Sequence, residues 1–333
     1  MTTKLKIHLL AQPDILSCAR TELTLIQGLR ALELEERIQL VDTVDAADFV
    51  ILSVLFFAIR PAPHDKADLR THQTHLSNVL RAIEKIPREK LVIVDVSDTS
   101  DIYVPLDRAK YTFKKSVYDS VPDGDFIRRI PAECFGRVNP WEYAALIPEY
   151  RPFPTIEKDI DLFCPVRRNP VHYHRNAVLD TLKGMRELDD YRTIIGAVSA
   201  GGLQNNKSEP VFDDVYFNHL ARAKIVVLCA PVWQSTVSLW ESLCAASLVI
   251  CDKLNFDWLQ PRILGGKHLL EYSDLGELKE HILYALDKDN AADVQQIRYK
   301  GFGWAMAHRP VNRVRYLINK LDTARSSRRV SER

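Results

Sequence analysis

The sequence predicts an α/β protein built from two doubly wound domains, each a mostly parallel sheet covered by helices. Apolar strand segments alternate with amphipathic helices in both halves of the chain, and this alternation is typical of parallel sheets. The alternation restarts after a proline-rich stretch that ends near Pro154. With 333 residues, the chain is long enough for two domains of ordinary size.

The proline-rich stretch places the predicted domain boundary near residue 150. We expect residues 1–150 to form the first domain and residues 151–324 the second, with the two facing each other across a cleft. Residues 325–333 (RSSRRVSER) are basic and poor in apolar side chains, so we expect a disordered tail there.

The first half contains segments with the composition of strands and segments with the spacing of helices. Runs of apolar and β-branched residues predict strands at residues 4–10, 38–41, 49–57, 91–96 and 111–116. Apolar residues recur at helical spacing in residues 14–32 and 65–86, which predicts amphipathic helices there. Each of these helices lies between two predicted strands, as a parallel sheet requires.

The second half repeats this pattern with a longer series of helices. Strands are predicted at residues 159–164, 193–198, 224–229, 247–251 and 268–272. Helices are predicted at residues 173–188, 211–222, 236–246, 275–286, 291–307 and 311–321. The pattern contains no internal repeat, so the two halves are similar in class and not in sequence.

The composition excludes several classes of protein. The formal net charge is +1, so no overall field favours nucleic acid or an anionic membrane as a partner. No apolar run approaches the roughly 20 residues that a membrane-spanning helix needs. The six cysteines are scattered without a CxxC pair, which favours buried free thiols, a cytoplasmic location and no zinc site.

The segment from His219 to Leu254 is the most informative one for function. It contains an apolar strand, a polar loop at residues 230–235, a helix that Thr236 is placed to cap, and a second strand. Loops of this kind lead from the carboxyl end of a strand into a helix N-terminus, where α/β proteins hold phosphates and sugars. Glu241 lies one turn into the helix, where a carboxylate could accept hydrogen bonds from vicinal hydroxyl groups.

A basic loop follows the strand at residues 159–164. Arg167, Arg168 and Arg175 lie in this loop and in the first turn of the next helix, where a guanidinium can bind phosphate through two N–H groups. The alternative interpretation is a solvated basic surface. His172 and His174 are two positions apart, which is poor spacing for metal ligands on one helix, so no metal is predicted there.

Acidic side chains crowd the end of the strand at residues 91–96 in the first half. Asp95, Asp98 and Asp101 are candidates for a general base, and so is His64, which follows the strand at residues 49–57. Capping and turn formation are the alternative roles for each of them. Asp95, Asp98 and His64 are nevertheless the predicted catalytic residues.

Several sequence blocks, taken in order, resemble a known family. They are IDLFCPVRRNPVHYHRNAVLDTL at residues 160–182, the block at 223–247 that contains WESLCAAS, the blocks at 267–286 and 301–318, and YTFKKSVY at 111–118. Their order and spacing resemble the GT-B glycosyltransferases, in particular the bacterial and viral branch related to spore-maturation glycosyltransferase-like proteins. The resemblance implies two Rossmann-like domains and the transfer of a sugar from a nucleotide-sugar donor to a glycan or other hydroxyl acceptor.

The resemblance also implies roles for the candidate residues. The second domain would hold the donor, with Glu241 on the ribose. The other predicted donor-binding residues are Trp233, Gln234, Ser235, Thr236, Arg167, Arg168 and Arg175. The first domain would bind the acceptor, with Lys114 and Lys115 reaching the cleft as a family Phe-Lys-Arg element does. The last helix would cross back to this domain, as in the family.

Transfer is expected to proceed without a metal cofactor. DxD triplets occur at residues 123–125, 159–161 and 287–289, but none directly follows a predicted strand. Backbone amides and an arginine would then stabilise the leaving diphosphate, a task that a divalent cation performs in other folds.

Departures from the family pattern keep a second function open. Trp233 stands where many retaining members have a glutamate, Ser238 where the branch often has an arginine, and Ser247 where a glycine is usual. A catalytically silent GT-B module that binds glycans or partner proteins is therefore the main alternative. An epimerase or phosphorylase of the same fold is a weaker one. A nicotinamide-dependent dehydrogenase is disfavoured because no GxGxxG follows the first strand.

Overall fold

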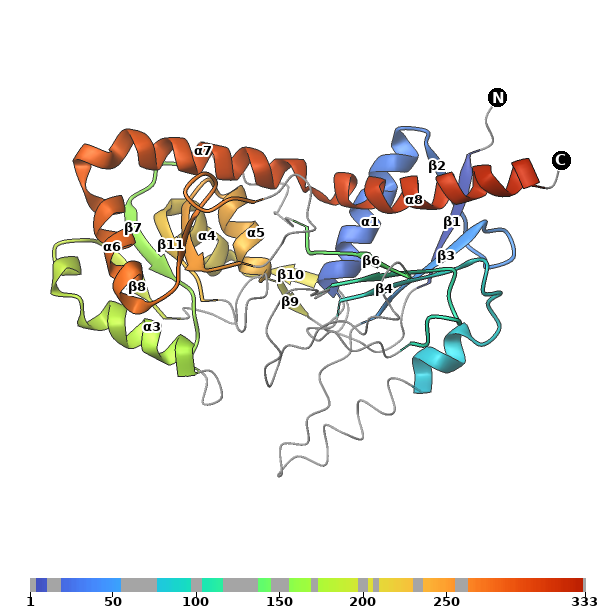
Figure 1. Cartoon of the computed structure of the whole chain (residues 1–333), viewed down its shortest axis with the longest axis horizontal. Coiled ribbons are helices and arrows are strands. Elements are labelled where there is room, and N and C mark those ends of the chain that lie inside the picture. The colour runs from blue at the N-terminus through green and yellow to red at the C-terminus, as the bar shows by residue number, and fades with distance from the viewer. Residues whose placement is uncertain are drawn as a thin grey trace. The chain divides into compact units, whose positions relative to one another are not determined.

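The computed structural model describes eleven stretches of the chain. These are residues 4–10, 19–54, 77–96, 104–115, 137–144, 156–168, 173–196, 203–205, 210–229, 236–254 and 263–331. The chain forms two compact units, one of Met1–Tyr143 with Pro310–Arg333 and one of Ala144–Arg309. We call them the N-terminal unit and the C-terminal unit, and their elements carry the labels of Figure 1.

The N-terminal unit is built on a sheet of six parallel strands in the order β2-β1-β3-β4-β5-β6. The strands are β1 (Leu5–Leu10), β2 (Ile38–Leu40), β3 (Phe49–Val54), β4 (Leu91–Asp95), β5 (Tyr111–Lys114) and β6 (Val138–Pro140). Every residue of β3 and β4 is buried, because helices cover both faces of the sheet. The register pairs Asp95 with Lys114 at the carboxyl edge.

Helices α1 (Ala19–Leu34) and α8 (Pro310–Ser331) pack on one face of this sheet, and residues 77–83 form a helix on the other. Figure 1 shows α8 crossing α1, with which it is in contact. Gly28 permits this packing, since a Cβ atom there would lie 2.4 Å from Cγ2 of Val314. The two helices therefore approach more closely than any larger residue at position 28 would allow.

The last helix differs in its unit from the predicted domain bounds and in its length from the predicted helix. Those bounds put residues 311–321 in the second domain, although the family resemblance also implied a last helix that crosses back to the first. Helix α8 packs its buried Val314, Leu317 and Leu321 onto the core of the N-terminal unit. The physical reason is that α1 presents the complementary apolar surface. The stretch predicted as a disordered tail, from residue 325, continues α8 through Ser331.

The C-terminal unit contains a sheet of five parallel strands in the order β13-β12-β11-β7-β8. The strands are β7 (Ile160–Cys164), β8 (Thr193–Ile195), β11 (Ala223–Val227), β12 (Leu248–Asp252) and β13 (Leu270–Tyr272). A separate antiparallel pair is formed by β9 (Leu203–Asn205) and β10 (Pro210–Phe212). The predicted fold class, α/β with two parallel sheets, is confirmed.

The helices of the C-terminal unit cover both faces of its sheet. They are α3 (Tyr173–Gly184), α4 (Asp214–Arg222), α5 (Val237–Cys244), α6 (Leu275–Leu286) and α7 (Ala291–Ala307), with 3-10 turns η4 (Arg186–Leu188) and η6 (Lys288–Asn290). Leu162 and Cys164 of β7 belong to the core that includes α3 and α6. Phe163 between them points the opposite way and meets Tyr216 of α4.

Helix α4 begins later than the sequence predicts. Residues 211 and 212, expected to start this helix, belong to strand β10 instead. The helix begins after Asp213, whose side chain accepts a hydrogen bond from the backbone N–H of Tyr216 at 3.0 Å. An aspartate cap therefore sets the helix start.

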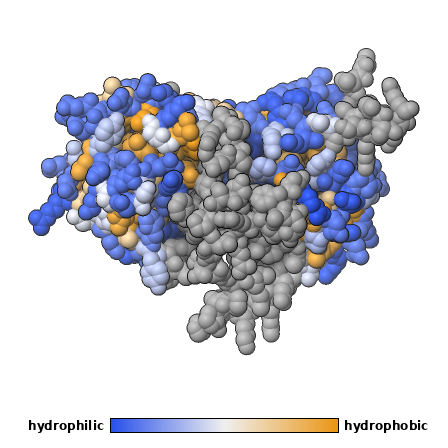
Figure 2. Space-filling view, in the orientation of Figure 1, coloured by the Kyte–Doolittle hydropathy of each residue, from blue (hydrophilic) through white to orange (hydrophobic). Residues whose placement is uncertain are grey.

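The surface of the described residues is mostly hydrophilic on the face shown in Figure 2, with hydrophobic residues in smaller groups. None of the helices in the stretches that the structure describes combines the length and the apolar character that crossing a bilayer would demand.

Candidate functional site

The carboxyl edge of the C-terminal sheet contains the point where the strand order reverses. From β7 the chain passes through α3 to β8, and it then returns through α4 to β11 on the other side of β7. The helix after β7, α3, and the helix after β11, α5, lie on opposite faces of the sheet. The loops that lead from β7 and β11 into these helices therefore diverge at this edge. Open α/β sheets bind ligands at such switch points.

Three arginines follow β7 at this edge. Arg167 and Arg168 are exposed, and Arg168 pairs with Asp180 of α3. Arg175 lies in the first turn of α3 and is half-buried, and its buried Nε has no hydrogen-bond partner among the described residues. Of these arginines, Arg175 thus combines partial burial with an N–H group left over for a ligand.

Helix α5 opens at the same edge after β11. Thr236 is its N-cap, with extended backbone (φ −107°, ψ 155°), and its side chain makes no capping hydrogen bond. The predicted cap position is therefore right, but the hydroxyl accepts no hydrogen bond from the first backbone N–H groups of the helix. Trp233, Gln234 and Ser235 lie outside the described residues.

Glu241 differs in placement from the prediction of a carboxylate open to a ribose. The residue is 1% exposed, and its Oε2 accepts a hydrogen bond of 2.9 Å from the phenol of Tyr216 in α4. Glu241 is the fifth residue of α5, and at that position its side chain faces α4. The carboxylate links two helices that cover the same face of the sheet.

Two further residues of the block at 223–247, Trp240 and Ser247, also have structural roles. Trp240 is fully buried and stacks on Trp304 with ring centroids 5.0 Å apart. Ser247, where the family usually has glycine, donates a hydrogen bond of 2.9 Å to the carbonyl of Ala223. The serine therefore ties the turn before β12 to the start of β11.

Lys158 binds backbone carbonyls at the C-termini of α4 and α5, beside Ser247. Its ammonium donates to the carbonyls of Ala221 at 2.8 Å and Ala245 at 2.9 Å. The partial negative charge at a helix C-terminus favours a cation there. Burial, and next the charge of Arg298, lower the pKa of Lys158 from 10.5 to about 7.

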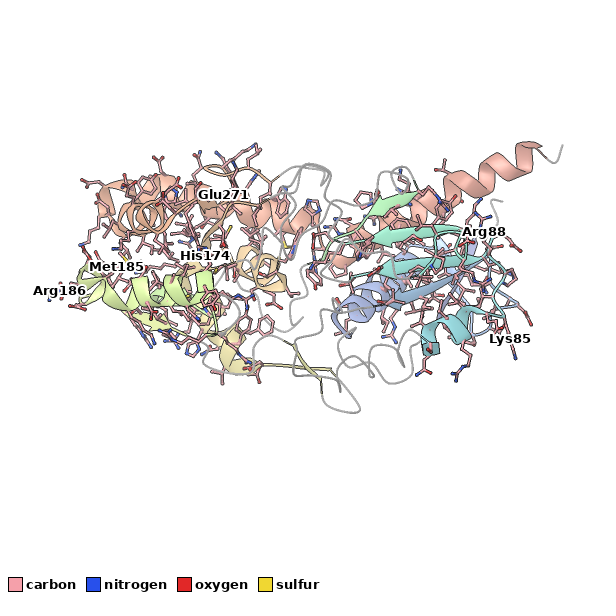
Figure 3. All side chains as sticks on the ribbon, turned by 60° about the horizontal axis from the view of Figure 1, so that its bottom comes forward. Lys85, Arg88, His174, Met185, Arg186 and Glu271 are labelled. Atoms are coloured by element: carbon pink, nitrogen blue, oxygen red, sulfur yellow. The ribbon has the colours of Figure 1, made fainter. Side chains whose placement is uncertain are left out.

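A cluster that the sequence analysis did not foresee joins α3 to the ends of two strands. Nε2 of His174 lies 3.2 Å from Oδ2 of Asp252, and Sγ of Cys229 lies 3.6 Å from the same oxygen. His174 is at the start of α3, with Arg186 just beyond its far end (Figure 3). The spacing of His172 and His174 along one helix does not reveal this group, because its members come from separate elements of the fold.

The chemistry of this cluster depends on burial and on Tyr272, the last residue of β13. The phenol of Tyr272 donates to Oδ1 of Asp252 at 3.1 Å. The hydrogen bond from His174 to Asp252 raises the pKa of the imidazole, and burial raises the pKa of the Cys229 thiol. The three side chains offer a nitrogen, a sulfur and an oxygen within 4.8 Å of one another.

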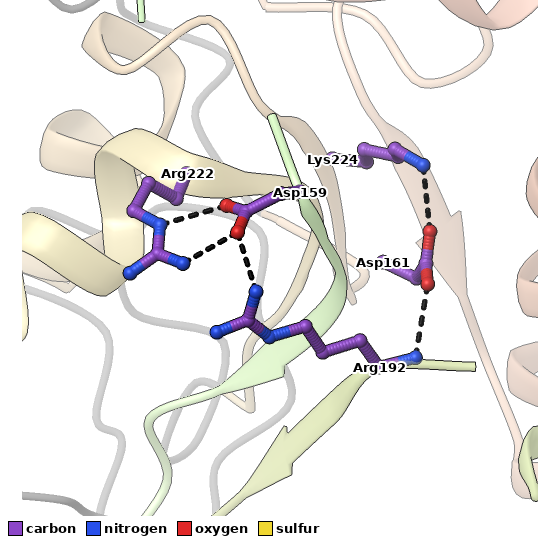
Figure 4. A network of polar contacts seen from close by, with 5 residues as sticks. All are labelled: Asp159, Asp161, Arg192, Arg222 and Lys224. Atoms are coloured by element: carbon purple, nitrogen blue, oxygen red, sulfur yellow. Dashed lines mark hydrogen bonds and ion pairs between the residues drawn. The ribbon is translucent and has the colours of Figure 1, made fainter. Parts of the chain in front are cut away.

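The DxD triplet at residues 159–161 lies at the opposite, amino edge of the sheet. Asp159 pairs with Arg222 and Arg192, and Oδ1 of Asp161 lies 2.7 Å from Nζ of Lys224 (Figure 4). The hydrogen bonds from Arg222, and next the charge of Arg192, lower the pKa of Asp159 to about 2. This triplet is an ion-pair network that joins three strands at their starts.

Of the other two DxD triplets, the one at residues 287–289 lies in a 3-10 turn. Asp287 is the N-cap of η6 and accepts a hydrogen bond from the backbone N–H of Asp289. Residues 123–125 lie outside the described residues.

In the N-terminal unit, two predicted residues form a buried ion pair. Asp95 is 3% exposed and Lys114 is fully buried, and Nζ of Lys114 lies 3.3 Å from Oδ2 of Asp95. Lys115 is also buried, with Nζ 4.5 Å from the ring centroid of Tyr143. The structure thus pairs Asp95, a predicted catalytic residue, with Lys114, predicted to reach the cleft, in the interior of the unit.

The remaining predicted residues of this unit, His64 and Asp98, lie outside the described residues, as does Asp101. Arg313 of α8 was not predicted to lie at this edge. It is buried and donates a hydrogen bond of 3.3 Å to the carbonyl of Tyr143. Burial lowers the pKa of Arg313 to about 10, opposed by the charge of Glu142.

Comparison with known proteins finds similarity in structure but not in sequence. No family model matches the chain, and no curated protein matches it either. A glycosyltransferase from Rickettsia africae ESF-5 superposes with a TM-score of 0.51 at 9% identity, over 97% of this chain and 99% of that chain. At this identity the likeness is one of fold.

Two further solved structures match over nearly the whole chain with lower scores. Anabaena Alr3699/HepE in complex with UDP and glucose has a TM-score of 0.49 at 10% identity, covering 96% of this chain and 100% of that one. AviGT4, a glycosyltransferase involved in avilamycin A biosynthesis, has a TM-score of 0.47 at 12% identity, covering 96% and 97%.

Proposed function

We propose that this protein is a glycosyltransferase that moves a sugar from a nucleotide-sugar donor to a glycan or other hydroxyl acceptor. The fold that it shares with the Rickettsia africae glycosyltransferase over 97% of its length makes this activity the natural hypothesis. A fold hosts many functions, however, so the proposal depends on the residues at the site.

The observation that carries the proposal is the group of phosphate-binding features at the switch point of the C-terminal sheet. The buried Nε–H of Arg175 has no hydrogen-bond partner among the described residues, and Arg167 is exposed. Helix α5 begins after Thr236, whose hydroxyl makes no capping hydrogen bond. A guanidinium and a helix N-terminus both favour a doubly charged diphosphate. We assign the donor diphosphate to this edge.

In this proposal Glu241 positions the donor site and does not touch the ribose. Its bond to Tyr216 holds α5 against α4, and so sets the direction of the amides at the start of α5. The N-terminal unit is proposed to bind the acceptor hydroxyl at the carboxyl edge of its own sheet. There Asp98 or His64 would act as general base, and Lys114 would hold Asp95 in place.

Transfer is proposed to need no divalent cation, because Arg175 and the α5 amides would neutralise the charge that develops on the leaving diphosphate. We expect turnover of the donor to persist in EDTA. Release of nucleoside diphosphate from UDP-, GDP-, ADP- and CDP-sugars is the measurement, made in EDTA and then with added magnesium or manganese. Activity that disappears in EDTA and returns with either cation would contradict metal-free transfer.

A silent binding module is the second candidate, and the burial of Glu241 favours it because a family donor contact is then missing. Calorimetry with UDP, GDP, ADP and CDP separates the two functions. A transferase binds at least one of them, and at a ligand concentration 100 times the Kd the folded state gains about 2.7 kcal/mol. Binding of glycans without any of the four nucleotides would support the silent module.

A further inference from the structure

We propose that His174, Cys229 and Asp252 form a binding site for a zinc ion. The ligand atoms are Nε2 of His174, Sγ of Cys229 and Oδ2 of Asp252. They come from the first turn of α3, from the residues just beyond β11, and from the last residue of β12. The ion would join three elements at the carboxyl edge of the C-terminal sheet.

The distances between the ligand atoms fit tetrahedral zinc. Zinc binds imidazole nitrogen and carboxylate oxygen at about 2.0–2.2 Å and thiolate sulfur at about 2.3 Å, so two ligands of a tetrahedron lie about 3.3–3.6 Å apart. The observed separations from Oδ2 of Asp252 are 3.2 Å to Nε2 of His174 and 3.6 Å to Sγ of Cys229. The third separation, between Nε2 of His174 and Sγ of Cys229, is within 4.8 Å, so a small adjustment of these side chains closes the site around the ion.

The set of ligands selects zinc over the abundant hard cations. A thiolate and an imidazole beside one carboxylate suit zinc, whereas magnesium and calcium take oxygen ligands. A thiolate and a carboxylate also balance the double charge of the ion. The occupied site therefore carries no net charge and does not repel the guanidinium of Arg175, whose charge acts on Cys229.

The surroundings supply an oriented ligand and an entry path. Tyr272 donates its phenol to Oδ1 of Asp252 at 3.1 Å, which leaves Oδ2 directed toward His174 and Cys229. Such outer hydrogen bonds fix the geometry of metal ligands. The side chain of His174 is 48% exposed, while Cys229 is buried, so the ion can enter from the His174 side and a water can fill its fourth position.

The zinc site is distinct from the proposed transfer chemistry. Without the ion, the three side chains remain linked through hydrogen bonds to Asp252, so α3 keeps its place. We therefore expect zinc to add stability without becoming a requirement for turnover. The test uses the metal alone, so its result does not depend on whether the protein is a glycosyltransferase.

The test is a titration of the full-length protein, freed of metal, with zinc in competition with a chromophoric chelator. We expect one high-affinity ion per chain that magnesium and calcium do not displace. Cobalt in the same site should show a thiolate charge-transfer band. Cys229→Ser should abolish that band and weaken zinc binding at least tenfold, and Tyr272→Phe should weaken it about tenfold as a residue behind the ligand.

Cys244→Ser is the matched control, because it removes another buried thiol of the same unit, on α5. Its zinc affinity and cobalt spectrum should equal those of the wild type. Asp252→Asn keeps the shape of the side chain and guards against a variant that fails to fold. Failure of the wild type to bind zinc, or an unchanged affinity in folded Cys229→Ser and Asp252→Asn, would overturn the proposal.

Discussion

The two edges of the C-terminal sheet use charged residues in opposite ways. At the amino edge, Asp159 and Asp161 are matched by Arg192, Arg222 and Lys224 in a closed network (Figure 4). At the carboxyl edge, Arg175 retains a buried N–H and Thr236 a hydroxyl that the described chain does not use. Satisfied charges hold strands together, whereas polar groups left over at a switch point are available to a ligand.

The difference also explains why a motif alone misleads. The sequence DID at residues 159–161 has the spacing of a metal-binding triplet, yet it lies at the edge where parallel strands begin. Ligands bind α/β sheets at the edge where strands end. Position along the strand, and not the triplet itself, decides which function a carboxylate can have.

The largest effect on nucleotide binding is expected from replacing Arg175 at the carboxyl edge. Arg175→Ala should weaken binding of the best nucleoside diphosphate about 10- to 100-fold, since a charge-assisted hydrogen bond is worth about 1.5–3 kcal/mol. Thermal stability should barely change. Arg186→Ala, an exposed position just beyond the far end of α3 (Figure 3), is the control and should bind as the wild type does. Equal affinity of all three proteins would remove Arg175 from the donor site.

Next in size is the tie between α4 and α5. Glu241→Ala leaves the buried phenol of Tyr216 without its acceptor, so the free energy of unfolding should fall by about 1–3 kcal/mol. In Tyr216→Phe the free energy of unfolding should fall by a similar or smaller amount. Both variants should lose nucleotide affinity to the same modest extent, because the bond between these two side chains sets the direction of the α5 amides. Urea denaturation and calorimetry give the two quantities. A tenfold loss of affinity in Glu241→Ala alone, at wild-type stability, would instead make Glu241 the ribose contact.

A smaller effect is expected at the amino edge. Arg222→Ala removes the two hydrogen bonds to Asp159 and should lower the midpoint of thermal unfolding modestly, because the pair is partly exposed. Nucleotide affinity should not change. A loss of affinity with unchanged stability would mean that the amino edge contributes to the binding site, and the contrast between the two edges would fail.

The last effect is measured as a pH dependence and not at a single pH, and it is expected at Lys158, which lies just before β7 at the amino edge. Its pKa is about 7 in the folded protein and near 10.5 in the unfolded chain, so the unfolded chain binds more protons between these values. Stability should therefore rise with pH across that window relative to Lys158→Met. Urea denaturation of both proteins at pH 7 and about pH 10 measures this, and parallel profiles would disprove it.

A good part of the fold could be predicted from local pattern. The apolar runs at residues 49–54, 91–95 and 223–227 are strands because both faces of a parallel sheet are buried. Thr236 is the N-cap of α5 because a cap depends on its nearest neighbours. The sequence also placed the arginines after β7, since chain order alone sets which loop follows a strand.

The partners of side chains could not be predicted in this way, because they come from elements far apart in the chain. Whether Glu241 faces a ligand or Tyr216 depends on how α5 rotates against α4. His174, Cys229 and Asp252 meet only after α3, β11 and β12 have packed.

The sequence by itself therefore determined the alternation of strands and helices, and the order of the loops that follow them. Tertiary structure decided which polar groups pair with one another in the interior, as Lys114 and Asp95 do. It also decided which of them keep an N–H available for a ligand, as Arg175 does. It decided, too, how α8 packs on the N-terminal unit, in close contact with α1 at Gly28. The physical reason is that hydrophobic periodicity is a local property, whereas burial and pairing are properties of surfaces that meet only in the folded chain.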